Sequence, residues 1–344
     1  MNTTFASDSL AAAVIDPAIK NVFLTVNLLC LSELIGIFGI AANIVNIIVF
    51  KRQGYRDGVN VTLTALAISD LGALCTQQIS NTFVDPWIRE TKFVMLKTHL
   101  FIFMIYAHGY FIRIGGLVTA FAAFERCILV SFPLKVKNFI TSKIAVLVNA
   151  TFFLVCLLYF IPLWLVVYVD WKYSPAINRS ILSMIFRENR ESVYSIYYFI
   201  ADMFVPYATI LMLLLFTTVI IRTLKTQSKW RKNAEVNAQR AEHFVSSKQR
   251  KVVVMLMAVS VMFMVCLTPH SILHTALGLF REMKVDGTYA SLYFVCYSFT
   301  TLLETVNCSA TIFVYATMST RYREELTLLV TYFKSKFRFH RISL

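Results

Sequence analysis

Long apolar runs alternate with short polar stretches along most of the chain. A helix needs about 20 mostly apolar residues to cross the hydrocarbon core of a bilayer, and seven segments reach that length. They are Val26–Phe50, Val61–Phe83, Leu100–Ile128, Ile144–Val169, Ser195–Thr223, Val252–Leu279 and Tyr289–Met318. Core helices of soluble proteins keep a polar stripe, whereas Val252–Leu267 is apolar almost all round. The pattern predicts an all-α integral membrane bundle of seven transmembrane helices.

The polar stretches between the runs leave no room for a soluble domain. We predict an extracellular tail (residues 1–25), a seven-transmembrane domain (26–318), and a surface helix with a cytoplasmic tail (319–344). In the last part, Tyr322, Leu326 and Val330 recur at helical spacing opposite charged residues. This spacing predicts a short amphipathic eighth helix on the membrane surface.

Two connecting segments are longer than the rest. We expect Asp170–Val193, on the outer side, to fold over the end of the bundle. Arg222–Lys251, on the inner side, contains no Gly or Pro, a composition that favours helical extensions of the fifth and sixth helices.

Composition and charge indicate the environment and the orientation. The chain is 58% hydrophobic and 15% charged, which is not the balance of a soluble protein. Most of the 33 Lys and Arg residues lie in the loops and the tail that would be cytoplasmic if the amino terminus is outside the cell. The positive-inside rule therefore predicts a multi-pass plasma-membrane protein with an extracellular amino terminus. Because the bases flank membrane spans, the lipid bilayer is the expected partner, and nucleic acid is not.

Glycosylation motifs and cysteines agree with this topology. The sequons at Asn2 and Asn178 face outward and are predicted to carry glycans, whereas Asn60 would face the cytoplasm. All seven cysteines fall within the spans or at their edges. We therefore expect no extracellular disulfide.

Polar and kinking residues inside the spans form an ordered set of motifs. The set comprises Asn43 in Gly39–Asn43, Asp70 in Leu66–Leu71, Glu125–Arg126 with Phe132–Leu134, Pro206, Phe263–Pro269, and Tyr315 with Tyr322–Arg323. With these motifs the chain resembles the rhodopsin-like (class A) G-protein-coupled receptors. The runs Phe124–Lys137 and Glu304–Tyr315 look most similar to candidate chemosensory receptors of molluscs. The resemblance implies a receptor that activates a heterotrimeric G protein, without a cofactor and without enzymatic activity.

The resemblance also implies roles for individual residues. The activation switch would comprise Asp70, Glu125, Arg126, Phe263, Pro269 and Tyr315. The contact with the G protein would be made by Arg126, Lys248, Arg250 and Lys251. Glu125 and Arg126 would pair in the resting state and separate when the helices move.

Asp70 would reach Asn307 on the seventh helix in a polar site that often holds sodium. It could equally be a structural hydrogen-bond hub, because Gly115 replaces the usual hydroxyl. No other metal site is expected.

Some family features are missing from this sequence. The outer cysteine of the third helix is Phe101, the tyrosine of the fifth helix is Leu214, and the tryptophan before Pro269 is Leu267. Thr311-Ile312 stands where the seventh helix usually has Asn-Pro. These changes put the transmission of activation in question and leave the fold unaffected.

Ionisable groups inside a membrane span are costly, so each is a functional candidate. His108 lies about five helical turns from Arg126 on the same helix face, and therefore at the outer end. The predicted ligand site comprises His108, Arg113, Asp202, His270 and Glu304. Such a set suits a small polar molecule or the end of a short peptide.

Two interpretations of these charges remain open. Arg113 and Asp202 either contact the ligand or simply neutralise each other. Glu304 has no evident internal partner, so we expect it to recognise a cationic group of the ligand.

Two other functions fit the pattern less well. A neuropeptide receptor of the same fold would normally carry the missing outer disulfide. A transporter should show repeated halves and a channel should show a repeated polar pore face, and neither is visible in the sequence.

Overall fold

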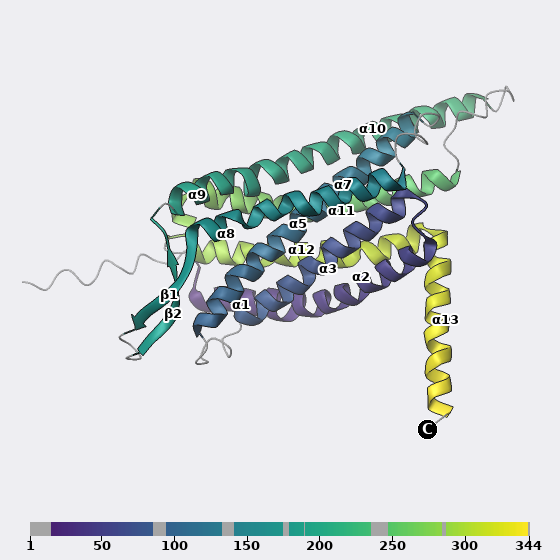
Figure 1. Cartoon of the computed structure of the whole chain (residues 1–344). Helices are drawn as coiled ribbons and strands as arrows, with labels where there is room; N and C mark the ends of the chain where they lie inside the picture. Colours follow the sequence, from purple (N-terminus) through teal and green to yellow (C-terminus); the bar gives the residue numbers. More distant parts are fainter. Residues whose placement is uncertain are drawn as a thin grey trace, which may run out of the picture.

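The computed structural model of the chain describes residues 15–84, 94–132, 141–174, 179–188, 190–234, 247–283 and 287–342. It is a bundle of long helices with a two-stranded hairpin at one end and a further helix, α13, at the other (Figure 1). We call these the hairpin end and the α13 end.

Among the described residues, six helices are long and apolar enough to cross a membrane. They are Pro17–Gln53, Gly58–Phe83, Leu100–Ser131, Ser142–Phe160, Ser195–Gln227 and Arg250–Leu279. The seventh helix of the bundle, α12 (Ala290–Met318), is richer in Ser, Thr and Asn, and many of these polar residues are buried. The prediction of a seven-helix bundle is confirmed, with one helix that is mostly enclosed by the others.

The first transmembrane helix begins earlier than the predicted start at Val26. It runs without a break through α1 (Pro17–Leu24), the π-helical η1 (Thr25–Ser32) and α2 (Glu33–Gln53). Oδ1 of Asp16 accepts a hydrogen bond from the Ala18 amide at 2.7 Å, and Pro17 stands at the first position. Both features start helices, so part of the predicted tail is helical. The helix ends at Gly54, whose φ of 83° suits glycine.

The second, third and fourth helices follow in order. They are α3 (Gly58–Val84), α5 (Val94–Ser131), α7 (Ser142–Cys156), the 3₁₀ turn η2 (Leu157–Phe160) and α8 (Ile161–Val166). The fourth helix stops at Val166, short of the predicted Val169, because the chain becomes a strand at Val167.

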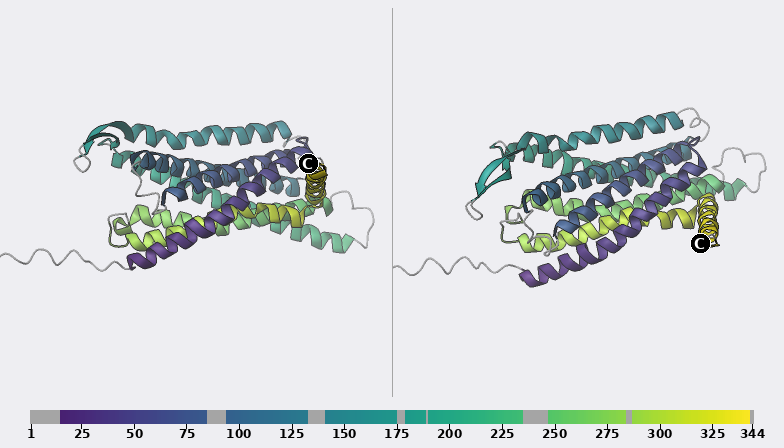
Figure 2. Two further views of the ribbon diagram at one scale, coloured as in Figure 1. Left: turned by 90° about the horizontal axis from the view of Figure 1, so that it is seen from below. Right: turned by 60° about the horizontal axis from the view of Figure 1, so that its bottom comes forward.

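The hairpin was not predicted. Strand β1 (Val167–Ser174) pairs antiparallel with β2 (Arg179–Phe186), in a register that runs from Val167 opposite Phe186 to Ser174 opposite Arg179. Its sequence is rich in β-branched and aromatic residues, which favour strands. The views in Figures 1 and 2 show the hairpin extending beyond the bundle, so the expectation that this loop folds over the bundle is wrong.

The remaining elements complete the bundle. They are α9 (Arg190–Tyr197), the π-helical η3 (Tyr198–Phe204), α10 (Val205–Ala234), α11 (Ser247–Leu279), the 3₁₀ turn η5 (Arg281–Met283), α12 and α13 (Thr320–Ile342). Helix α10 continues well past the predicted end at Thr223, as the composition of the inner loop suggested. Helix α13 confirms the predicted eighth helix and runs roughly at right angles to the bundle (Figure 1).

Candidate functional site

The predicted ligand residues meet in one cavity near the hairpin end of the bundle. His108, Arg113, Asp202, His270 and Glu304 all line it, although they come from α5, η3, α11 and α12. The cavity has a volume of about 70 Å³. One water needs about 10–15 Å³ on this scale, so the space suits a ligand of a few non-hydrogen atoms.

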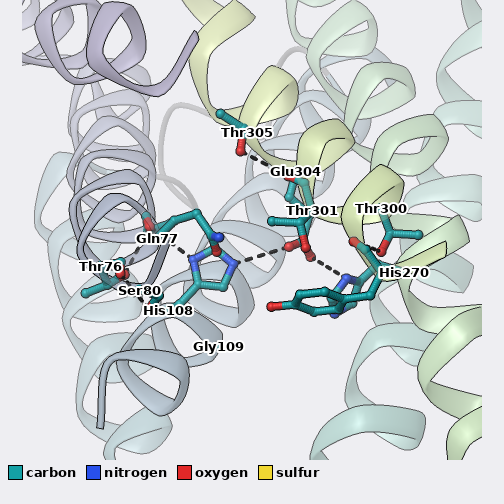
Figure 3. Close-up of polar contacts among 12 residues, drawn as sticks. Thr76, Gln77, Ser80, His108, Gly109, His270, Thr300, Thr301, Glu304 and Thr305 are labelled. Atoms are coloured by element: carbon teal, nitrogen blue, oxygen red, sulfur yellow. Dashed lines mark hydrogen bonds and ion pairs between the residues drawn. The ribbon is translucent and has the colours of Figure 1, made fainter. Parts of the chain in front are cut away.

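Glu304 is the centre of the polar contacts in this cavity. Its Oε2 lies 3.2 Å from Nε2 of His108, and its Oε1 lies 3.2 Å from Nδ1 of His270. Figure 3 shows the carboxylate held between the two imidazoles. Glu304 is only 3% exposed, and a buried carboxylate requires such partners. The expectation that Glu304 has no internal partner is therefore wrong, because two helices bring histidines to it.

Arg113 on α5 and Asp202 on η3 form an ion pair in the same cavity. The guanidinium also donates from Nε to the Ala201 carbonyl and from Nη1 to the Gly109 carbonyl, both at 2.9 Å. Its Cζ lies 4.1 Å from the centre of the Tyr159 ring, a cation–π distance. Arg113 and Asp202 therefore neutralise each other's charge and also line the cavity, so whether they also contact the ligand stays open.

Several residues in the cavity wall or in contact with it were not assigned to the site from the sequence. His274 stacks on His270 with the ring centres 4.2 Å apart, and the Tyr198 hydroxyl donates to the His274 carbonyl. A signal existed, since His270 and His274 are four residues apart and therefore share a helix face. Tyr159 and Tyr198 could not be assigned, because only the assembled bundle brings them to this position.

The floor of the cavity is apolar. Phe263 and Leu267 line it and pack with Ala120, Ala123 and Leu213 in a buried cluster. A Cβ added to Gly116 would lie 3.0 Å from the Phe263 ring. The predicted switch residue Phe263 therefore contacts both the cavity and the α5 backbone.

Asp70 is buried in α3 and interacts with the Cys308 side chain. Within the described chain no hydrogen bond joins Asp70 to Asn307, and Oδ2 of Asp70 has no hydrogen-bond partner. Cys308, the residue that follows Asn307, takes the direct contact with Asp70 and also interacts with Asn307, so a polar site shared by Asp70 and Asn307 stays a prediction. No group of three or more His, Cys, Asp or Glu side chains in the described ranges is arranged to hold a metal ion.

At the α13 end, Glu125 and Arg126 form no salt bridge among the described residues. Oε2 of Glu125 accepts a hydrogen bond from the Thr62 hydroxyl at 3.3 Å, and the same hydroxyl accepts one from Asn149 at 3.4 Å. None of the ion pairs within the described residues includes Arg126. The two charges still interact electrostatically, so their pairing in a resting state stays a prediction.

Arg126 instead lines a second cavity, of about 420 Å³, at the α13 end. Asp57, Lys251, Tyr315 and Tyr322 share its wall. The other predicted G-protein contacts also lie on α11. Arg250 is exposed and precedes Lys251, and Lys248 lies about one helical turn before Lys251. Pro269 lies inside α11, between Leu267 and His270, which line the first cavity.

Comparison with known families matches residues 31–332 to the family described as serpentine type 7TM GPCR chemoreceptor Srw. The match covers most of the chain. This protein belongs to the Srw chemoreceptor family. No curated protein matches the chain. The membership makes the protein a seven-helix chemoreceptor of the G-protein-coupled type.

A polar network connects α2, α12 and α13 of this Srw chemoreceptor. The Tyr322 hydroxyl donates to Oδ1 of Asn46 at 2.5 Å, and Nδ2 of Asn43 donates to the Cys308 carbonyl at 2.8 Å. The rings of Tyr315 and Tyr322 lie 5.7 Å apart, and both contact Phe50. Helix α13 is thus fixed to the bundle by a buried tyrosine.

The predicted modification sites of the chemoreceptor are placed only in part. Asn2 and Asn178 lie outside the described residues. Asn60 is buried, and its Nδ2 donates to the Gly54 carbonyl at 2.8 Å. All seven cysteines are free thiols.

Proposed function

We propose that this Srw chemoreceptor binds a small polar ligand in the cavity around Glu304 and activates a heterotrimeric G protein at the α13 end. The observation that carries the proposal is the buried charged cavity itself. Groups from α5, η3, α11 and α12 converge on it, and such groups are retained inside a membrane span mainly for function.

The proposed orientation puts the hairpin end outside the cell and the α13 end in the cytoplasm of the plasma membrane. Arg126, Lys251 and Arg321 all line the cavity at the α13 end, which agrees with the positive-inside rule. The small volume of the other cavity favours a small molecule over a peptide that inserts deeply.

The order of motifs from Asp70 to Tyr315 supports a finer relationship. We infer that this Srw receptor uses an activation route similar to that of the rhodopsin-like receptors. The similarity of the Glu304–Tyr315 run to mollusc candidate chemosensory receptors points to a chemosensory ligand.

The contacts suggest how ligand and G protein are coupled. A ligand that binds Glu304 competes with His270 for the carboxylate, and so changes the packing of α11 against α12. Phe263 and Pro269 lie on the same helix as His270. Phe263 lines the apolar floor of the cavity, and Pro269 immediately precedes His270 in the chain. Movement of α11 would carry Lys251 away from Arg126 and widen the cavity at the α13 end, which the G protein enters.

Cells that express the receptor together with dissociation sensors for each Gα class test the proposal. The challenge is a panel of small amines, amino acids and carboxylates. We expect at least one compound to give a response that is lost in His270→Ala and kept in Leu211→Ala, a matched change at an exposed apolar position of α10. A surface-expressed receptor that answers no compound, or answers equally in His270→Ala, would overturn the proposal.

A further inference from the structure

The ring of His108 contacts two hydrogen-bond acceptors at once. Its Nδ1 lies 3.0 Å from the Ala73 carbonyl oxygen, and its Nε2 lies 3.2 Å from Oε2 of Glu304. A carbonyl and a carboxylate only accept, whereas a neutral imidazole has one donor nitrogen and one acceptor nitrogen. A neutral His108 would direct a lone pair at one of these oxygens. If Glu304 is ionised and both contacts are hydrogen bonds, both nitrogens carry a proton, and His108 is an imidazolium beside the Glu304 carboxylate.

The surrounding charges support this assignment. The titratable and charged groups around the pair are Glu304 and Tyr297 on α12, His270 and His274 on α11, Arg113 on α5 and Asp202 on η3. Arg113 and Asp202 neutralise each other. A protonated His108 then neutralises Glu304, so the empty cavity contains no uncompensated charge, as burial demands.

His108 can change from a donor to an acceptor without moving. After loss of the Nε2 proton, Nδ1–H still donates to the Ala73 carbonyl, and Nε2 presents a lone pair to the cavity. An ammonium group placed beside Glu304 could then donate to the carboxylate and to this nitrogen together. One positive charge enters as one proton leaves, so the charge balance is kept.

An anionic ligand could not bind by a comparable exchange of charge, because the cationic side chain of Arg113 is already engaged. Three nitrogens of Arg113 already donate, to Ala201, Gly109 and Asp202, and its face lies over Tyr159. Freeing this guanidinium would strand Asp202 as a buried charge.

We propose that the ligand class of this cavity is a small ammonium cation, which replaces the protonated His108 as the partner of Glu304 and releases one proton. The proposal rests on the proposed function of the cavity, and it adds the ligand class and the proton exchange.

Nuclear magnetic resonance of the purified receptor in lipid nanodiscs, with ¹⁵N-labelled histidine rings, tests the resting state. We expect one histidine with both ring nitrogens protonated at neutral pH, and we expect that signal to be missing in His108→Gln. It should persist in Leu211→Ala, a change at an exposed apolar position of α10 outside the cavity. A spectrum in which every buried histidine is neutral would overturn the proposal.

The exchange is tested with methylammonium as the probe, by thermal stability of the same nanodisc receptor across a range of pH. Release of one proton predicts that the affinity rises about tenfold per pH unit while the empty site is protonated. His108→Gln should abolish this slope, and Leu211→Ala, outside the cavity, should retain it. Tetramethylammonium, which has no N–H donor, should stabilise far less.

Two results would contradict the exchange: a methylammonium affinity independent of pH, or stronger stabilisation by acetate than by methylammonium. Neither assay uses a G protein, so failure here is distinguishable from failure of the receptor function.

Discussion

Nε2 of His108 lies 3.2 Å from Oε2 of Glu304, although 196 positions separate the two residues in the chain. The contact joins α5 to α12 across the interior of the bundle. His270 brings α11 to the same carboxylate. A single buried side chain therefore connects the three helices that would have to move relative to one another in a receptor of this family.

The first prediction concerns that connection. Glu304→Leu should lower the free energy of unfolding by about 3–5 kcal/mol, because the positive charge inferred for His108 would lose its partner. The double change His108→Leu with Glu304→Leu should recover much of this loss, since no charge is stranded. Thermal unfolding of purified receptor measures both. A double variant as unstable as the sum of the single variants would show that the residues do not interact.

The second prediction concerns Arg113 and Asp202. Asp202→Asn should reduce surface expression, because Arg113 then keeps its charge with only carbonyl acceptors and a ring as partners. Replacing both, as Arg113→Met with Asp202→Leu, should restore expression, measured by antibody binding to an amino-terminal tag. Restored expression with lost agonist response would place the pair in the ligand site as well. Expression unaffected by Asp202→Asn would contradict the structural role of the pair.

The third prediction uses two glycines on α5. A Cβ on Gly109 would lie 2.6 Å from the Tyr159 hydroxyl and 2.8 Å from Nη1 of Arg113, whereas one on Gly115 meets nothing closer than 3.4 Å. Gly109→Ala should therefore cost about 1–3 kcal/mol through overpacking. Gly115→Ala is the matched control, since both changes improve helix propensity by about 1 kcal/mol. Equal thermal stability of the two variants would contradict the packing around Arg113.

The sequence predicts the helices of this protein well, because run length and all-round apolarity determine a membrane span without reference to neighbours. It predicts the cavity residues for a related reason: an ionisable group in an apolar run is conspicuous. It could not predict the partner of Glu304, since two histidines from distant helices become neighbours only when the bundle forms.

Other differences between expectation and structure have local physical causes. The strand at Val167–Ser174 continues an apolar run, so hydropathy alone could not separate it from the preceding helix. The Glu125–Arg126 pair, which the family resemblance implies, forms no salt bridge among the described residues, although the two are adjacent in the sequence. Adjacent residues on a helix point in different directions, however, and Thr62 on α3 lies closer to the carboxylate.

The fourth prediction tests the orientation in the membrane. Asn2→Gln and Asn178→Gln should each remove one glycosidase-sensitive shift in electrophoretic mobility. Asn60→Gln should remove none, because Asn60 is buried and donates to the Gly54 carbonyl. Loss of a glycan on changing Asn60 would reverse the proposed topology.

The final prediction addresses G-protein activation itself. Arg126 is buried in the wall of the 420 Å³ cavity, and none of the ion pairs in the described chain engages it. It is therefore available to an incoming partner. Arg126→Ala should leave folding near normal, because no salt bridge among the described residues is lost, and should remove the contact at the centre of the proposed docking cavity.

The most direct test is the rate of GDP release from a panel of purified Gα proteins, measured with the receptor in nanodiscs. We predict that the wild-type receptor accelerates release from at least one Gα class, and that Arg126→Ala returns the rate to that of empty nanodiscs. Identical rates for the wild-type receptor, Arg126→Ala and empty nanodiscs would contradict the account, as would acceleration that survives in Arg126→Ala.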